Sequence, residues 1–487
     1  MYEHLESVTQ MSEYRTTPWA ASFRVFFLIG MLVNSVMLLA AARGDLWFDE
    51  IWSISFAESA RTPWDIVSVF KHDNNHVLNT FFLYAIGRHD NLMVYRTLAI
   101  ASGIASLALL VVIARKWGSR EGILALVFAG TSYPLILYFS EARGYAPAIF
   151  FSLASCYLLQ EGLSRFSRWR MVLFWLAAIL GTLSHFSFVI VFLSLVIFIF
   201  AREIAARSSF RDTLLQLSRY ALVPFVFIGA FYLYFTRDMV IGGGDKSTIT
   251  AEIMRGAVSL LGMPDGLMAT KLPLIVLLLL VSAAVYFFYR DRDIAWSFYL
   301  SVLLLLPSAV ILVARPVYFN FRYVILCFPF FYLMLSFLFG RLYRSSGKYR
   351  HILTVLVCLF VIGQTQRLVP LFQLGRGSYR PILAEMVRRS RGDVISIGSD
   401  HDFRNGLLLS FYSRFLPPRK SIRYIEQPLW GMEMPEWIIK HSTAPSYEPP
   451  PFLVVSNENI YELTKEEKFA GNSGFGWFLY HHRTNGQ

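Results

Sequence analysis

The chain has 487 residues, of which 55% are hydrophobic, 16% aromatic and only 16% charged, and its formal net charge is +12. This balance excludes an ordinary soluble protein, in which about a quarter of the residues are charged, and it indicates a membrane protein with many spans. The basic residues are scattered singly instead of clustering on one soluble face, so the charge does not predict a nucleic-acid partner. Cys156, Cys327 and Cys358 lie in apolar runs and show no disulfide framework or zinc spacing.

Apolar runs long enough to cross a membrane, about 20 residues each, recur along the chain. The run at 171–201 is too long for one span and is interrupted at 184–187, so we interpret it as a hairpin of two short spans. With this hairpin, the sequence predicts about eleven transmembrane helices. The other nine are expected at about 22–42, 92–114, 121–139, 145–160, 219–236, 272–289, 295–314, 323–340 and 351–368.

The distribution of Lys and Arg over the connecting loops predicts the orientation in the membrane. With the hairpin in place, the density of basic residues is about threefold higher in the loops on one side, which is therefore the cytoplasmic side. A single span at 171–201 would instead place Arg202, Arg207, Arg211 and Arg219 outside. We therefore expect a cytoplasmic N-terminus and a periplasmic or extracellular C-terminal part.

Two longer segments are expected on the outer face. The first outer loop, residues 43–91, carries aromatic residues among polar ones, which is typical of short helices that lie in the interface plane. The proline-rich residues 369–487 contain short strand-like runs at 394–397, 422–425 and 452–455. The sequence thus predicts a transmembrane domain at 1–368 and a small soluble α/β domain at 369–487.

An acidic pair, Asp49 and Glu50, follows the first predicted span by a few residues and is flanked by aromatic residues. Adjacent carboxylates under partial desolvation raise one another's proton affinity, which brings a general base nearer neutral pH. An acidic interface loop without a catalytic role is the alternative. A divalent metal ion held by this pair is also possible, although one pair supplies few ligands.

Further polar residues gather at the outer ends of other predicted spans. An ionisable group near hydrocarbon costs a few kcal/mol, so such clusters favour a functional site over chance. A histidine pair four residues apart, His72 and His76, is only a weak metal pattern without a third ligand. The candidates at these turns are Lys71, His76, Glu141, Arg143, Tyr145, His185, Arg322 and Tyr323.

In this order and on this topology, the clusters resemble the GT-C superfamily of integral-membrane glycosyltransferases. The resemblance is to the bacterial group similar to protein O-mannosyltransferases and aminoarabinose transferases, which use polyprenyl-phosphate sugars. It is carried by the acidic pair, the polar run after it, and the segments at 140–145, 184–186 and 321–323. Many relatives read His-Pro-Pro-Leu-Tyr after the acidic loop, whereas this chain has His-Val-Leu-Asn-Thr from His76, which leaves the role of that histidine open.

The resemblance implies a GT-C architecture and the transfer of a sugar from a polyprenyl-phosphate donor to an acceptor hydroxyl at the outer face of the cytoplasmic membrane. The acceptor would be a glycolipid, a polysaccharide or a protein. Asp49 would be the general base, with Glu50 orienting it, and inversion by a single displacement is expected. Arg143, Arg322 and Lys71 would bind the lipid phosphate, while the other candidates, among them Tyr145 and His185, would bind the sugar or phosphate.

Other functions are compatible with the same membrane pattern. A transporter or flippase for lipid-linked sugars would place polar groups near the middle of the bilayer, whereas here they gather at one face. A polysaccharide ligase or polymerase would use the same donor, but would be expected to centre on a large late loop. No Gly-rich nucleotide cradle is present, which agrees with a lipid-linked donor.

Overall fold

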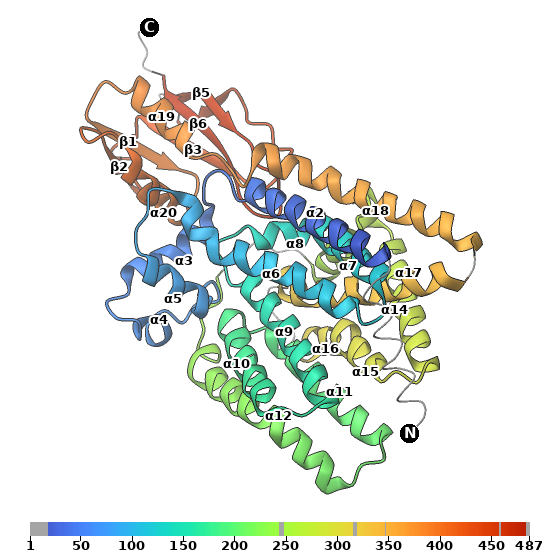
Figure 1. Ribbon diagram of the computed structural model, residues 1–487. Coiled ribbons are helices and arrows are strands. Elements are labelled where there is room, and N and C mark those ends of the chain that lie inside the picture. The colour runs from blue at the N-terminus through green and yellow to red at the C-terminus, as the bar shows by residue number, and fades with distance from the viewer. Residues whose placement is uncertain (1–17, 243–247, 315–318, 346, 457–458, 484–487) are drawn as a thin grey trace.

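A bundle of helices carries a small sheet domain at one end (Figure 1). The computed structural model describes residues 18–242, 248–314, 319–345, 347–456 and 459–483. The helices of the bundle are α2 (Pro18–Ala41), α6 (Thr97–Ala114), α7 (Ser119–Thr131), α8 (Tyr133–Phe139), α9 (Tyr145–Ser164), α10 (Arg168–Ser184), α11 (Phe188–Ala205), α12 (Phe210–Phe231), α13 (Ile249–Leu261), α14 (Leu272–Arg290), α15 (Ala295–Leu300), α16 (Leu306–Ala309), α17 (Phe328–Ser345) and α18 (Gly347–Leu374). Short 3₁₀ and π turns, η1 (Leu92–Arg96), η2 (Tyr232–Thr236), η3 (Asp265–Ala269), η4 (Ser301–Leu305), η5 (Val310–Ala314) and η6 (Phe321–Cys327), extend or connect them.

The bundle is that of an integral membrane protein. Among the described residues, eight helical segments are long and apolar enough to cross a membrane, or nine if one bent pair forms a single span. Large hydrophobic side chains on their outer faces are exposed, for example Leu28 and Leu32 of α2 and Phe225 of α12, as expected where lipid replaces water. Helices α9 and α10 occupy two further predicted positions but are not among the eight. The total of eleven spans stays a prediction.

The segment predicted as one span at 121–139 is broken. Helices α7 and α8 meet at an angle of 68°, because Pro134 cannot donate a helical hydrogen bond and Ser132 caps the second helix by accepting from the Leu135 amide. The buried side chain of Gln364 stabilises the break, because its Oε1 accepts a hydrogen bond from the Tyr133 amide at 2.9 Å. The freed backbone group therefore has a partner inside the bundle.

The hairpin predicted at 171–201 is present as two helices. Helix α10 ends at Ser184 and α11 begins at Phe188, with His185 in an extended conformation between them. The His185 ring accepts from the Ser187 amide at 3.1 Å, which closes the turn. The prediction that this run forms two helices is confirmed.

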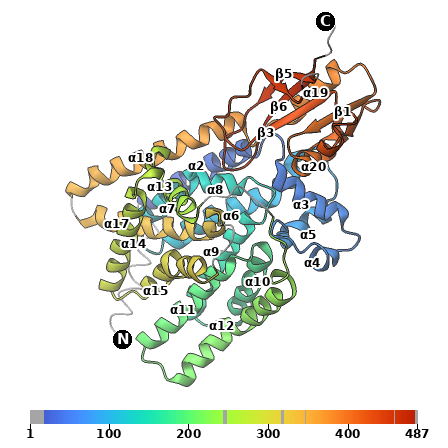
Figure 2. The same ribbon diagram turned by 180° about the vertical axis from the view of Figure 1, so that it is seen from behind.

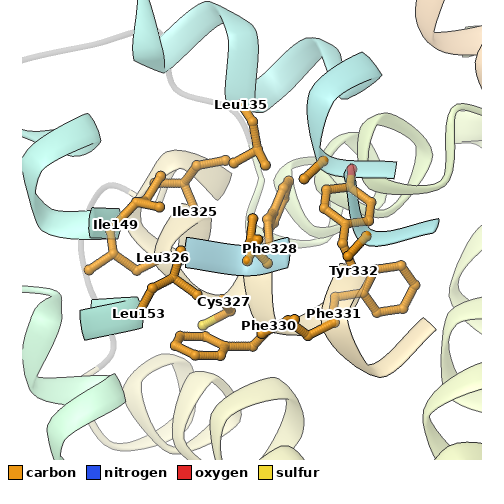
Figure 3. Close-up of a cluster of buried hydrophobic side chains, with 14 of the residues drawn as sticks. Leu135, Ile149, Leu153, Ile325, Leu326, Cys327, Phe328, Phe330, Phe331 and Tyr332 are labelled. Carbon is orange, nitrogen blue, oxygen red and sulfur yellow. The ribbon is translucent and has the colours of Figure 1, made fainter. Parts of the chain in front are cut away.

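Packing between α8, α9, η6 and α17 fixes the end of the bundle that faces the sheet domain. Figure 3 shows Leu135 of α8, Ile149 and Leu153 of α9, and Leu326 of η6 in one cluster. All four side chains are fully buried. Because the turn between α8 and α9 and the first residues of η6 both extend from this cluster, their polar side chains are held in fixed relative positions.

The first loop, residues 43–91, folds into the short helices α3 (Phe48–Ser59), α4 (Asp65–Ser68) and α5 (Val77–Ile86), which confirms the predicted helices there.

The C-terminal part forms one mixed sheet. Its strands are β1 (Val394–Ser399), β2 (Ser421–Tyr424), β3 (Trp437–Ser442), β4 (Phe452–Val454), β5 (Ile460–Glu467) and β6 (Gly476–His482). They lie in the order β2-β1-β3-β6-β5-β4, with β1 parallel to β2 and β3 and the other pairs antiparallel. Two helices, α19 (Arg380–Arg389) and α20 (Asp402–Tyr412), and two 3₁₀ turns, η7 (Ser413–Phe415) and η8 (Gln427–Leu429), belong to this domain.

The sheet domain and the first loop share one hydrophobic core. Side chains of α3, including Phe48 and Ile51, pack with Leu409 of α20 and Trp477 of β6, and both views show α3 beside α20 (Figures 1 and 2). The Tyr412 hydroxyl also donates to the carbonyl of Leu46 at 2.7 Å. The C-terminal domain is therefore packed onto the first loop rather than tethered beside it.

Candidate active site

A cavity of about 590 Å³ lies where the first loop, the helix bundle and the C-terminal domain meet. Its walls include Asp49 and Trp52 from α3, Arg322 from η6, Arg404 from α20 and Phe475 from the loop before β6. Its volume is in the range of ligand pockets, about 300–1,000 Å³, and its walls combine aromatic rings with many charged side chains, which suits a charged ligand. Asp49 of the predicted acidic pair lines it, together with Arg143 and Arg322.

Helix α3 places Asp49 at the cavity. The helix begins after Trp47, and Glu50 in its first turn accepts a hydrogen bond from the Trp47 amide at 3.1 Å, as in the carboxylate half of a capping box. Both carboxylates lie in the first turn, where the helix dipole stabilises negative charge. The two side chains diverge, however, because Asp49 lines the cavity whereas Glu50 is fully buried behind it.

Two arginines converge on the Asp49 carboxylate. The distance from Asp49 Oδ2 to Arg143 Nη1 is 2.9 Å and to Arg322 Nη1 is 3.2 Å. Arg143 comes from the turn between α8 and α9, and Arg322 comes from η6. A single carboxylate thus bridges two guanidinium groups that are far apart in the sequence.

The two guanidinium groups have remaining donors. The Nε atoms of Arg143 and Arg322 are buried and have no hydrogen-bond partner among the described residues. Arg143 also stacks on aromatic rings, with its Cζ 4.9 Å from the centre of Tyr145 and 5.9 Å from that of Trp47. Buried donors without a partner are rare in proteins and call for an explanation, which an anionic ligand would supply.

Glu50 belongs to a fully buried ion pair behind the cavity. It accepts from Arg96 Nε at 2.7 Å, from Arg96 Nη2 at 2.6 Å and from the Ala142 amide at 2.8 Å. Burial alone would raise the pKa of Glu50, but Arg96 holds that pKa below its ordinary value. The geometry gives Glu50 no contact with the cavity, so its contribution there is to join α3 to the turn that carries Arg143.

Glu141 occupies a similar buried position. It accepts from Arg376 Nε at 3.2 Å, and its Oε2 lies 4.0 Å from Arg143 Nη1. Burial raises the pKa of Glu141 despite these two arginines. Arg376, which follows α18, also donates to the carbonyls of Ala41 and Leu137, so this pair anchors the C-terminal domain to the bundle.

The two candidate histidines lie behind Tyr145 rather than on the cavity wall. The ring centres of His76 and His185 are 5.0 Å apart, and that of His185 is 4.7 Å from Tyr145. Burial, together with the nearby Arg143, lowers the pKa of His185 to about 3 and that of His76 well below its ordinary value. Both imidazoles are therefore neutral at physiological pH and support Tyr145 from behind.

Five of the ten candidate residues line the cavity. Asp49, Arg143, Tyr145, Arg322 and Tyr323 line it. The remaining five do not line it, namely Glu50, Lys71, His76, Glu141 and His185. The Lys71 ammonium group lies 4.7 Å from the ring centre of Tyr234 instead.

Several cavity residues were not predicted from the sequence. Asp73 and Asn74 come from the polar run in which Lys71 and His76 were chosen. Arg255 and Arg367 also line the cavity and pair with Glu252 and Asp265. The C-terminal domain adds Arg404, which donates to His441 at 2.7 Å and stacks 4.5 Å from the ring centre of Phe475. No local sequence pattern distinguished these residues.

The acidic pair does not fit a divalent metal ion. The carboxylate oxygens of Glu50 are taken by Arg96 and Ala142, and Asp49 faces two arginines. Within the part of the chain that the structure describes, no group of three or more His, Cys, Asp or Glu side chains is arranged to hold a metal. Cationic neighbours at both carboxylates disfavour a further cation.

Comparison with known proteins identifies the fold. No protein-family model and no curated protein sequence matches the chain. The crystal structure of ArnT from Cupriavidus metallidurans in the apo state aligns with a TM-score of 0.54 at 13% identity, over 95% of this chain and 97% of that one. A structure of ArnT from the same organism bound to undecaprenyl phosphate aligns with a TM-score of 0.42 at 14% identity, over 97% and 99%. The chain therefore has the fold of ArnT, in agreement with the fold that the sequence resemblance implied.

Proposed function

We propose that the protein is a glycosyltransferase that moves a sugar from a polyprenyl-phosphate donor to an acceptor hydroxyl. The observation that carries this proposal is the convergence of Arg143 and Arg322 on Asp49 in the cavity. The GT-C fold supports it, because the likeness to ArnT extends over nearly the whole of both chains.

The arginine pair suits a phosphate leaving group. Breaking the bond between the anomeric carbon and the phosphate oxygen leaves the electron pair on that oxygen, so the negative charge of the lipid phosphate increases. Fixed guanidinium donors at this oxygen stabilise the transition state more than the ground state. The unpartnered Nε atoms of Arg143 and Arg322 are available for this purpose.

Asp49 is the general base of the proposed reaction. As the acceptor oxygen attacks the anomeric carbon, its proton passes to the Asp49 carboxylate, and the sugar is transferred with inversion in one displacement. Asp49 lies at ion-pair distance from both arginines and offsets one of their two positive charges. A donor phosphate competes for the same guanidinium groups, so its binding releases Asp49 for proton transfer.

The acceptor reaches Asp49 from the side of the C-terminal domain. Phe475 and Arg404 of this domain line the same cavity as Asp49, whereas the bundle side is occupied by Arg143 and Arg322. The acceptor class, whether glycolipid, polysaccharide or protein, is not determined by these contacts. We place the reaction at the outer face of the cytoplasmic membrane, following the predicted distribution of basic loops.

Lipid analysis tests the proposal directly. The wild-type protein and its Asp49→Asn variant would be purified in mild detergent, and bound lipids would be identified by mass spectrometry. We expect a glycosylated polyprenyl phosphate in both samples, and the mass would identify the sugar. The proposal is wrong if neither protein retains such a lipid and added polyprenyl phosphate raises the thermal stability of neither.

A further inference from the structure

Asn74 connects Asp49, the proposed base, to Arg143, which is proposed to bind the donor phosphate. Its Oδ1 accepts from Arg143 Nη2 at 2.8 Å, and its Nδ2 donates to the backbone carbonyl of Asp49 at 2.8 Å. The Asn74 side chain is therefore fixed at both ends, by one bond to each partner. Resting on the proposed function, we infer that Asn74 is a positioning residue that sets the orientation of Arg143 towards the donor phosphate.

The surroundings of Asn74 make this orientation rigid. The residue is 5% exposed. Its Nδ2 also donates to Ser53 Oγ at 3.2 Å. Ser53 lies one turn after Asp49 on α3, and its single hydroxyl proton can go to the Asp49 carbonyl at 3.0 Å or to the Asn74 carbonyl at 3.2 Å. The amide of Asn74 therefore cannot rotate without breaking its bonds to Arg143, Asp49 and Ser53.

The chemistry of an amide suits this role better than that of a carboxylate. Arg143 already faces one carboxylate, Asp49, at 2.9 Å. The neutral Oδ1 of Asn74 holds Nη2 without adding a second negative charge, so the guanidinium group keeps its attraction for a phosphate. The Nδ2 group of the same amide donates a hydrogen bond to the Asp49 carbonyl. An aspartate at this position has no N–H group and could not make this bond.

The next residue in the chain offers a matched control. Asn75 is also 5% exposed, and its Nδ2 donates to two backbone carbonyls, those of Ile66 and Phe70, each at 2.7 Å. It does not line the cavity. Asn75→Ala therefore removes a buried amide of equal size from the same loop without touching the arginines.

The test is the binding of undecaprenyl phosphate to the detergent-solubilised full-length protein, measured by microscale thermophoresis. Asn74→Ala is expected to weaken binding about tenfold, the effect of losing a hydrogen bond to a charged group. Asn75→Ala is expected to lower the thermal midpoint while leaving the dissociation constant within about twofold of wild type. Asn74→Asp is expected to weaken binding at least as much as Asn74→Ala.

A double-mutant cycle separates positioning from a general effect on the fold. If Asn74 acts through Arg143, then Asn74→Ala weakens binding in the wild type but has no further effect in the Arg143→Ala background. Equal effects in both backgrounds, or unchanged binding by Asn74→Ala in the wild type, would overturn the inference. Absence of binding by the wild-type protein would instead contradict the proposed function itself.

Discussion

Glu50 and Arg96 form an ion pair of two hydrogen bonds with no exposed surface, 46 residues apart in the chain. Arg96 also donates to the carbonyls of Ala42 and Asp45, so the pair ties the end of α2 and the start of α3 to η1. Glu50 in turn accepts from Ala142, next to Arg143. The pair thus fixes the relative positions of Asp49 and Arg143, although it touches neither side chain.

We expect Glu50→Gln to destabilise the fold by about 3–5 kcal/mol, because Arg96 would stay buried without a compensating charge. The measurement is thermal or denaturant unfolding in detergent. Glu161→Gln is the control, since Glu161 pairs with Lys116 at 2.8 Å but both side chains are about one third exposed, which limits the loss to about 0.2–1 kcal/mol. Equal stability of the two variants would contradict a structural role for the buried pair.

Asp49→Asn is expected to have opposite effects on binding and on transfer. Removal of the bridging carboxylate frees Arg143 and Arg322 from their internal anion, so undecaprenyl phosphate should bind about tenfold more tightly. Transfer of sugar should fall by about 10²-fold or more, because an amide cannot accept the proton. Weaker lipid binding by the variant would contradict competition between Asp49 and phosphate, and retained transfer would exclude Asp49 as the base.

The topology can be tested at the C-terminal end of the chain. An odd number of spans and a cytoplasmic N-terminus place residue 487 outside, so a periplasm-active reporter fused there should be active. The N-terminal residues 1–17 lie outside the described residues, and the structure leaves the orientation in the membrane as a prediction. A silent periplasmic reporter together with a working cytoplasmic one would reverse the assignment of both ends.

Helix positions were predictable because each apolar run is long and separated from the next by polar residues. The break in 121–139 was not predicted, since its cause is a single proline supported by a glutamine more than 200 residues later. In the C-terminal domain, three strands were predicted from apolar runs, at 394–397, 422–425 and 452–455. Strands β3, β5 and β6 were not, as β5 carries several charged residues and β3 ends in polar ones.

Three of the residues that line the cavity, Asp49, Arg143 and Arg322, could be picked out from the sequence because each is a charged residue close to an apolar run. The polar run at 71–76 has no such contrast, so its sequence does not indicate which side chain faces inward, and Asn74 rather than Lys71 meets Arg143. Arg404 and Phe475 reach the cavity only because the C-terminal domain packs onto α3. This tertiary contact joins segments more than 350 residues apart and has no local pattern.

The low pKa of His185 predicts a loss of stability in acid. Its pKa falls from an ordinary value of 6.5 to about 3 in the folded protein. The unfolded chain therefore binds this proton at a higher pH than the folded chain does, and the contribution to stability is complete above about pH 6.5 and is lost as the pH falls towards 3. The slope for one proton is about 1.4 kcal/mol per pH unit.

His185→Gln removes this titration. We expect the stability advantage of wild type over the variant to shrink steadily from pH 7 to pH 4, as followed by thermal unfolding in detergent at constant ionic strength. His481→Gln serves for comparison: burial also lowers the pKa of His481, but its side chain is 38% exposed, so we expect the same trend at a smaller size. A difference between wild type and His185→Gln that is independent of pH would show that the buried imidazole does not titrate in this range.

Gly474 tests whether the C-terminal domain forms part of the catalytic cavity. Its φ angle is +118°, and a Cβ at this position would overlap the carbonyl oxygen of Arg376. The loop before β6, which places Phe475 at the cavity wall, must therefore shift in Gly474→Ala, and the strained backbone costs about 1–3 kcal/mol.

Transfer of sugar by Gly474→Ala should fall about tenfold or more, whereas binding of undecaprenyl phosphate at Arg143 and Arg322 should change by no more than about twofold. Gly431→Ala, in the same domain and with nothing within 4 Å of its added Cβ, should match wild type in both measurements. If Gly474→Ala transfers sugar as fast as Gly431→Ala, the loop before β6 is a structural connection and the acceptor approaches Asp49 from another side.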